Sequence, residues 1–337
     1  MQKNYLGIDV SKLSFDLALL TVKNGVKQTM LTNKFDNNAA GLKAFHNYLI
    51  EQGVTFDQNS LLVIENTGIY HRLIWEFCSS HLLPLYIGNA ADLKWSFGIA
   101  RIKNDKVDSM RLCDYACKNY EDLKLTPALN KSFIMLKDLL SNRSKLISQK
   151  NGIQQTLKEL KTSNDKATQK MMETINKAAL DGLKKSIKLI EAEMRKIVKG
   201  DGSVLTNYNL MVTVPGIGEI TAIFILCCTN NFAIKVSGKQ LASYAGVVPC
   251  EHSSGTSVKG RSKVSHMANK ELKSILSMGA LSAVTAYPEF GDYYDRKIKK
   301  GKKHLQVMNA IKNKMLLRVV SVVNSGTPYV NNYQKAC

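Results

Sequence analysis

The first third of the chain alternates short apolar runs with amphipathic stretches. The apolar runs predict β-strands at residues 5–10, 13–22, 27–35, 60–65 and 83–88. Lys23, Asn24 and Gly25 form a hairpin turn sequence between the second and third of these strands. Residues 37–52 and 71–80 have helical periodicity. Three strands followed by alternating helix and strand predict an α/β domain over residues 1–125.

The middle of the chain has a different pattern. Residues 131–199 contain no proline and alternate Leu, Ile and Met with Lys, Glu and Gln. This composition predicts long exposed helices, arranged as an antiparallel pair that breaks near residues 162–165. We expect residues 126–204 to form a helical connector that acts as a spacer or a dimerising coiled coil. A basic arm facing nucleic acid is a compatible alternative.

The last third, residues 205–337, is predicted to be a mostly α-helical domain. Helical segments are expected around residues 239–244, 269–286 and 297–323. The last of these is basic and is followed by a tail that contains Gly and Pro.

Charge narrows the class of protein. Lys and Arg number 47 against 27 Asp and Glu, which gives a formal net charge of +20. Such an excess favours a polyanionic partner, because phosphate contacts supply affinity for any nucleic-acid sequence. The lysines are spread along the chain, which disfavours a membrane surface. An odd number of cysteines and no apolar run of about 20 residues predict a cytoplasmic protein.

Four acidic residues stand out by their position. Asp9 ends the first predicted strand and Glu65 a later one, while Asp105 and Asp108 share one face if their segment is helical. Acids at strand ends, after three strands and alternating helix and strand, are typical of a ribonuclease-H-like nuclease core. Converging carboxylates repel one another unless cations lie between them, and oxygen ligands suit Mg²⁺. The sequence therefore predicts a site for Mg²⁺ or Mn²⁺ that serves phosphoryl transfer.

A glycine-rich turn precedes an apolar helix in the last third. The sequence Pro215-Gly216-Ile217-Gly218 resembles the hairpin of a helix-hairpin-helix motif. There Gly216 and Gly218 would let the backbone approach a phosphate, and the next helix would offer free N–H groups. A turn between two packed helices is the structural alternative.

Residues 241–276 contain a polar segment rich in Ser, Gly, Lys and Arg. We expect a flexible basic loop that presents Ser253 and Ser254 just before Gly255. Three cations beside the serines are candidates for holding phosphates: Lys259, Arg261 and Lys263. By loop composition alone, a solvated pair of serines is the better explanation of the segment.

The two blocks together resemble the transposases and invertases of the IS110 family. The first block is the Asp, Glu, Asp-x-x-Asp set, and the second is PGIG, YAGVVP, SSG and a following Lys. The resemblance implies a RuvC-like N-terminal domain whose metal ligands are Asp9, Glu65, Asp105 and Asp108. It also implies a serine nucleophile, Ser254 or its neighbour Ser253, of which Ser254 is preferred because Gly255 follows it.

The resemblance covers most of the chain and is weakest in the helical middle. It implies a structured bridge RNA that selects donor and target DNA, so the expected partners are the element ends, the target and this RNA. We expect a homo-oligomer, a dimer or tetramer, associated with the nucleoid and not with a membrane. Three residues depart from the family pattern: Cys250, Ala268 and Lys273. Lys273 keeps the positive charge of the usual arginine without its bidentate geometry.

The sequence is best interpreted as a DNA transposase or site-specific recombinase. A RuvC-like structure-specific nuclease with water as nucleophile explains the acids but leaves the serine segment unused. A non-catalytic nucleic-acid-binding protein explains the charge but not the placement of the acids.

Overall fold

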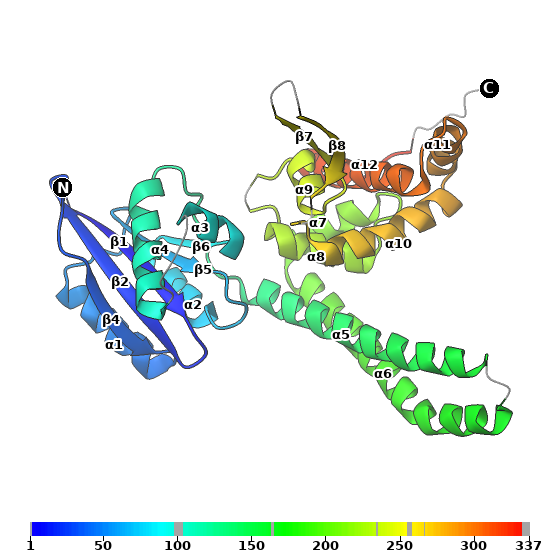
Figure 1. Ribbon diagram of the computed structural model, residues 1–337, viewed down its shortest axis with the longest axis horizontal. Helices are drawn as coiled ribbons and strands as arrows, with labels where there is room; N and C mark the ends of the chain where they lie inside the picture. Colours follow the sequence, from blue (N-terminus) through cyan, green and yellow to red (C-terminus); the bar gives the residue numbers. More distant parts are fainter. Residues whose placement is uncertain are drawn as a thin grey trace. The chain divides into compact units, whose positions relative to one another are not determined.

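The computed structural model describes residues 2–97, 104–162, 165–233, 235–254, 258–265 and 267–331, with the backbone alone for 250–254 and 258–263. The chain divides into two compact units, Met1–Leu129 and Asn130–Cys337, which are described separately. Figure 1 shows their elements.

A mixed six-stranded sheet forms the centre of the N-terminal unit. Its strands are β1 (Gln2–Val10), β2 (Ser14–Lys23), β3 (Val26–Lys27), β4 (Leu31–Asp36), β5 (Ser60–Glu65) and β6 (Leu85–Gly88). The order is β3-β2-β1-β5-β6, with β4 also paired to β2. β1 is antiparallel to β2 and parallel to β5, which is parallel to β6.

Helices cover both faces of this sheet. The helices are α1 (Ala39–Glu51), α2 (Arg72–His81), α3 (Ala90–Ser96) and α4 (Asp105–Asn119). Phe45 of α1 and Phe77 of α2 pack in one apolar cluster with alternate residues of β1, whereas Leu93 of α3 and Leu112 of α4 pack in another. Because β1 and β5 are buried from both sides, their sequences are nearly continuous apolar runs.

The α/β prediction for this unit is confirmed in its strand and helix order. The expected third strand is interrupted at residues 28–30, between β3 and β4. The helix α3 was not foreseen, and α4 was foreseen only as a condition on the two acids. Most predicted strand and helix ends lie within about three residues of the observed ends, as is usual for helix boundaries.

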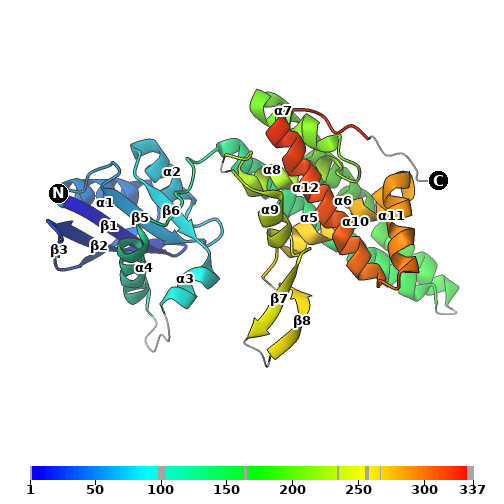
Figure 2. The same ribbon diagram turned by 90° about the horizontal axis from the view of Figure 1, so that it is seen from above.

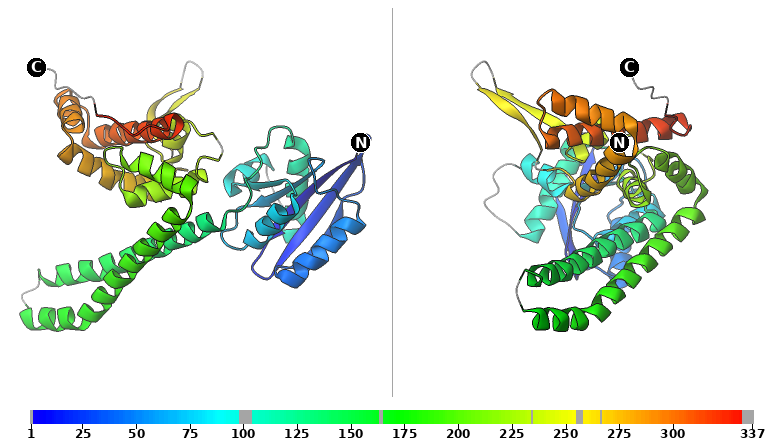
Figure 3. Two further views of the ribbon diagram at one scale, coloured as in Figure 1. Left: turned by 180° about the vertical axis from the view of Figure 1, so that it is seen from behind. Right: turned by 90° about the vertical axis from the view of Figure 1, so that its right-hand side faces the viewer.

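Two long antiparallel helices, α5 (Lys131–Leu160) and α6 (Lys166–Gly200), begin the C-terminal unit, as the pattern predicted. Figure 3 shows them side by side. Phe133 and Leu136 of α5 and Met194 of α6 pack into the core of the C-terminal unit. Farther along the pair, Arg143 bonds Glu191 with an N–O distance of 2.8 Å. The pair is therefore anchored in that core at one end and held together by polar contacts beyond it.

The rest of the C-terminal unit is mostly helical, as predicted, with one small hairpin (Figure 2). Its elements are α7 (Gly202–Val212), α8 (Glu219–Thr229), α9 (Gly238–Tyr244), β7 (Pro249–Ser254), β8 (Val258–Val264), α10 (Lys270–Ala286), α11 (Pro288–Lys299) and α12 (His304–Ser325). The basic helix expected at 297–323 is in fact the end of α11 and most of α12. None of the helices in the described ranges combines the length and the apolar composition that a membrane crossing requires.

Candidate active site

Two of the predicted acids end neighbouring parallel strands. In the register of β1 and β5, Ile8 is paired with Ile64, so Asp9 and Glu65 follow at the same edge of the sheet. Both strands are held in place by buried side chains on each face. The apolar runs of β1 and β5 thus fix the positions of the two acids that follow them.

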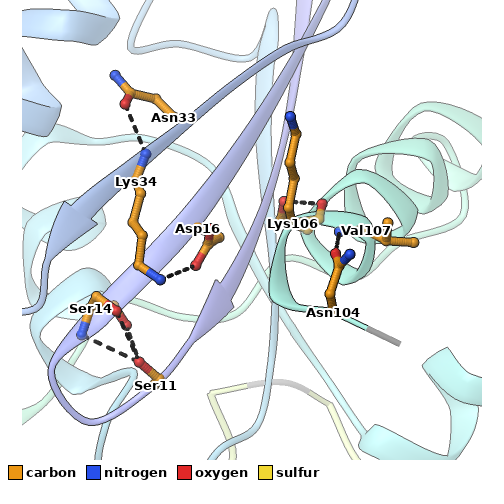
Figure 4. A network of polar contacts seen from close by, with 9 residues as sticks. Ser11, Ser14, Asp16, Asn33, Lys34, Asn104, Lys106 and Val107 are labelled. Atoms are coloured by element: carbon orange, nitrogen blue, oxygen red, sulfur yellow. Dashed lines mark hydrogen bonds and ion pairs between the residues drawn. The ribbon is translucent and has the colours of Figure 1, made fainter. Parts of the chain in front are cut away.

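The other two acids lie in the first turn of α4. The Asn104 side chain caps this helix by accepting a hydrogen bond from the Val107 N–H at 2.7 Å (Figure 4). The cap places Asp105 and Asp108 at the positive end of the helix dipole, where carboxylates are stabilised. Asp108 also accepts a hydrogen bond from Arg111 at 2.7 Å.

Gly7 brings α4 against β1. A Cβ atom at Gly7 would lie 2.1 Å from the Cys113 backbone nitrogen and 2.2 Å from the Ser109 carbonyl oxygen. In addition, the Cys113 thiol donates to the Tyr5 carbonyl at 3.1 Å. Only glycine permits this approach, which holds the turn carrying Asp105 and Asp108 near the end of β1.

The pKa of Asp9 is raised by its surroundings, which include the other three acids. Burial, followed by the charges of Asp105, Asp108, Glu65 and Asp16, raises the pKa of Asp9 from 3.8 to about 6. A carboxyl group whose ionised form is disfavoured by other carboxylates gains from any cation placed among them. The other three acids predicted from the sequence therefore each act electrostatically on Asp9.

Asp16 is a fifth acid that the sequence reasoning missed. It pairs directly with Asp9 across β1 and β2, and its carboxylate contacts Lys34 of β4 with an N–O distance of 3.3 Å. Figure 4 shows this ion pair between β2 and β4. The signal was present in the hairpin register, because Asp9 and Asp16 stand at matching distances from the turn between the two strands.

The loops after β1 and β5 are joined by a residue that the sequence reasoning also missed. The Asn37 amide donates to the Ser11 carbonyl and to the Tyr70 carbonyl, each at 3.0 Å. Among the described residues, the buried Asn37 Oδ1 and Thr67 Oγ1 have no hydrogen-bond partner. Buried polar atoms are nearly always bonded, so an ordered water molecule would satisfy these two oxygens.

The donor set consists of hard carboxylate oxygens, the ligands that Mg²⁺ and Mn²⁺ prefer. Within the described residues, no group of three or more His, Cys, Asp or Glu side chains is arranged to hold a metal ion. Carboxylates without a cation between them repel one another, and this repulsion adds to the effect of burial in raising the pKa of Asp9. The chemistry of the carboxylates of Asp9, Glu65, Asp105 and Asp108 is of the kind that suits a divalent cation.

The predicted serine loop is instead a β-hairpin. Ser253 is paired with Lys259 and Ser254 with Val258 in the register of β7 and β8, and a bulge interrupts the pairing between Cys250 and His252. In residues 258–264 the long cations Lys259, Arg261 and Lys263 stand at every second position, the spacing that places side chains on one face of a strand. Gly255, which motivated the preference for Ser254, lies outside the described residues. The basic residues Arg261 and Lys263 are in β8 with Lys259.

Gly216 has a packing role in the turn between α7 and α8. Its φ is +83°, and a Cβ there would lie 2.7 Å from the Gly279 carbonyl oxygen of α10. Gly218 has open space around it and precedes α8, whose first turn contains Glu219. Glu219 is paired with Arg195 at 2.6 Å. A phosphate at the start of α8 would be repelled by the carboxylate of Glu219. The close packing of Gly216 against α10 is by itself a sufficient reason for glycine at that position.

Two family models match the chain. A DEDD transposase model of IS110 elements matches residues 6–176, just over half of the chain, and includes all four predicted acids. A model described as the transposase IS116/IS110/IS902 family matches residues 208–295, which include Gly216, Ser253 and Ser254.

Curated relatives agree with the models. The chain is 29% identical to the pilin gene-inverting protein of Moraxella lacunata and 28% identical to that of Moraxella bovis, over 98% of each chain. It is also 30% identical to an uncharacterised 43.6 kDa protein of insertion element IS110 in Streptomyces coelicolor, over 36% of this chain and 29% of that protein. A DEDD domain suggests use of a divalent metal, and members of this family act on DNA. The chain belongs to the IS110 family of transposases.

Proposed function

We propose that this protein cuts and rejoins DNA at the ends of a mobile or invertible segment. The observation that supports the proposal is the raised pKa of Asp9, to which burial contributes most, followed by the charges of Asp105, Asp108 and Glu65. The match over 98% of the length of two pilin gene-inverting proteins supports DNA inversion or transposition as the outcome.

In this proposal the N-terminal unit is a ribonuclease-H-like, RuvC-like domain. Support comes from the sheet order, in which an antiparallel β4-β2-β1 half is followed by β5 and β6 parallel to β1. The four acids hold Mg²⁺ or Mn²⁺, which would stabilise the charge that develops on the phosphoryl oxygens. Asn37, through the two carbonyls that it bridges, keeps the loops after β1 and β5 together around the acids.

A serine of the β7–β8 hairpin is the proposed nucleophile, either Ser254 or Ser253. Its Oγ forms a bond to phosphorus as the bond from phosphorus to the leaving DNA oxygen breaks, and the hydroxyl proton passes to a base. The resulting protein–DNA ester keeps the bond energy until a DNA hydroxyl attacks it and releases the serine. A serine hydroxyl needs activation for this attack, so the serine and the carboxylates must act on the same phosphate, within one chain or between subunits of a homo-oligomer.

The C-terminal unit supplies the nucleic-acid contacts in the proposal. Its cations, among them Lys259, Arg261 and Lys263 of β8, are suited to phosphates. The turn at Gly216 and Gly218 remains a helix-hairpin-helix candidate, although the negative charge of Glu219 disfavours phosphate binding there. The family resemblance adds a bridge RNA as guide, and digestion of co-purified RNA before the assay should then abolish recombination.

A recombination assay with the element's own ends and RNA tests the serine step. Ser254→Ala removes the hydroxyl with little change in volume or charge, so folding and DNA binding should survive while recombination and the covalent DNA adduct are lost. Ser253→Ala is the alternative assignment, and the exposed Ser243→Ala of α9 is the matched control. If the double Ser253→Ala, Ser254→Ala variant recombines normally, serine catalysis is wrong, and the water-using nuclease becomes the better explanation.

A further inference from the structure

A cavity of about 530 Å³ lies at the base of the β7–β8 hairpin, in the C-terminal unit. Val247 and Val264 line it from the hairpin side, and residues of α11 and α12 line it from the other. Its volume is within the range of about 300–1,000 Å³ that is usual for small-molecule sites. The cavity is separate from the acids of the N-terminal unit, and neither the family match nor the proposed chemistry accounts for it.

The cavity combines an aromatic wall with cations. The half-buried Tyr293 lines it, together with Val307, Lys297 and Lys302. Three cations lie near the Tyr293 ring: the distances to its centroid are 4.9 Å from the Lys314 Nζ, 5.6 Å from the Lys297 Nζ and 5.8 Å from the Arg296 Cζ. Among the described residues that line the cavity, none is acidic. A ligand with a flat ring and a negative charge matches this lining.

Two amides on α12 complete the lining. Asn309 and Asn313 are four residues apart, so they lie on one face of the helix. Lys312, only 5% exposed, donates to the Asn309 Oδ1 at 3.3 Å and thereby orients the amide. Within the described part of the chain, no hydrogen bond engages the Asn309 Nδ2 atom or the Asn313 amide. These groups are available to the polar edge of a ligand in the cavity.

We propose that this cavity binds one unpaired nucleotide of a DNA strand. The base lies against Tyr293, its edge hydrogen-bonds Asn309 and Asn313, and the flanking phosphates contact Lys297 and Lys302. A base inside a duplex is stacked on both faces and paired along its edge, so only an extruded or single-stranded base can enter such a recess. The inference depends on the proposed function only for the identity of the polymer as DNA.

Strand exchange gives this site a use, because rejoining strands in a new order requires base pairs to open. Stacking on an aromatic side chain is worth about 1–3 kcal/mol per base and tolerates any sequence. A stacking pocket would therefore hold an opened strand without dictating its sequence, leaving selection to other contacts.

The test compares two DNA duplexes that differ by one extrahelical 5-iodouracil, with full-length protein in EDTA so that no strand is cut. The bulged duplex should bind about tenfold more tightly than the paired one, from the stacking energy above. Irradiation should crosslink the iodouracil to Tyr293. Tyr293→Leu should abolish both the crosslink and the preference, while Tyr293→Phe, which keeps the ring, should retain the preference. Asn313→Leu should weaken binding of the bulged duplex only.

Two double lysine variants test whether the positive charge that lines the cavity contributes to the preference for the bulged duplex. Lys297→Gln with Lys302→Gln should reduce the preference for the bulge. Lys299→Gln with Lys300→Gln, which removes the same charge outside the cavity lining, should weaken both duplexes equally. Equal binding of the two duplexes by wild type, crosslinks confined to other residues, or equal losses in the two lysine pairs would overturn the proposal. A preference seen only with a bulged RNA would overturn the assignment to DNA. Because the assay needs neither metal nor cleavage, it is independent of the serine and carboxylate chemistry.

Discussion

Residues 1–129 contain 14 Lys and Arg against 13 Asp and Glu, whereas residues 130–337 contain 33 against 14. The N-terminal unit is therefore nearly neutral, and the C-terminal unit carries a net charge of about +19, almost the whole excess. The unit with the clustered acids has no large positive field to neutralise them, so a small divalent cation can do so. The positive charge of the C-terminal unit attracts a polyanion.

The two units also differ in how precisely they position polar groups. In the N-terminal unit, strand register and the close approach at Gly7 locate the acids. In the C-terminal unit the cations are spread over helices and a hairpin, as phosphate contacts that are independent of sequence permit. We therefore expect the acid-dependent part of the chemistry in the N-terminal unit, and the proposed serine and most of the nucleic-acid affinity in the C-terminal unit, and each variant below tests that division.

The largest effect is expected for Asp9→Asn in catalysis. Losing a central ligand should remove several kcal/mol of charge stabilisation, which corresponds to a decrease in recombination rate of about 1,000-fold or more. DNA affinity should change little, because it resides in the other unit. Recombination and gel-shift assays measure the two properties, with the exposed Asp122→Asn as control. If DNA affinity falls as far as the recombination rate, the division between units is wrong.

Gly7→Ala should be the next most damaging change. The new Cβ would overlap the backbone of Cys113 and Ser109, and neither can yield without moving α4 off the sheet. We expect a loss of about 1–3 kcal/mol or more in the free energy of unfolding, and weaker divalent-metal binding because Asp105 and Asp108 move with α4. Denaturant unfolding and metal titration measure these effects. Gly152→Ala in α5, where a Cβ meets nothing, should be neutral or slightly stabilising.

Salt dependence is expected to differ between the units. Lys299→Gln with Lys300→Gln should reduce the slope of log K against log salt by about 1 for each phosphate that the protein no longer neutralises. The exposed pair Lys12→Gln with Lys43→Gln in the N-terminal unit should leave the slope unchanged. Binding titrations between about 50 and 200 mM salt give the slopes. A larger change from the N-terminal pair would reverse the assignment of affinity.

The sequence predicted those features that depend on local pattern. The strands β1 and β5, the break between α5 and α6, and the helices α8 and α10 follow from apolar periodicity and from Pro and Gly. The acids were identifiable because each lies at a strand end or in a capped helix turn. The serine segment was expected to be a loop, because its polar composition hides the pairing of β7 with β8, which depends on contact between segments.

Other features could not be predicted because they depend on contacts between distant segments. The bridge that Asn37 makes between the loops after β1 and β5 requires knowing that β1 and β5 are neighbours. The packing of Gly216 against Gly279 brings together residues on α10 and on the turn before α8. The amides that line the hairpin cavity look like ordinary polar positions of α12 until the fold places the hairpin beside them.

The smallest predicted effect concerns the stability of the N-terminal unit as a function of pH. The pKa of Asp9 is about 6 in the folded protein and near 3.8 when the side chain is exposed. Between these values the unfolded chain releases the proton while the folded chain retains it, so stability falls as pH rises from about 4 to 6. Above about pH 6 the folded protein bears the full cost of burying an ionised Asp9 near other carboxylates, and below about pH 3.8 it bears none of this cost.

Asp9→Asn removes the buried charge, so without metal it should raise the melting temperature at about pH 7.5 by a few degrees and change it much less at about pH 4. Added Mg²⁺ should stabilise the wild type more than the Asp9→Asn variant. It should stabilise the wild type at the higher pH, where Asp9 is ionised, and should stabilise Asp9→Asn little, because one ligand is missing. Thermal melts in EDTA and in Mg²⁺ at both pH values give all four comparisons. If Asp9→Asn lowers the melting temperature in EDTA at the higher pH, the carboxylate of Asp9 is stabilised by its surroundings, and the acids are not poised to accept a cation.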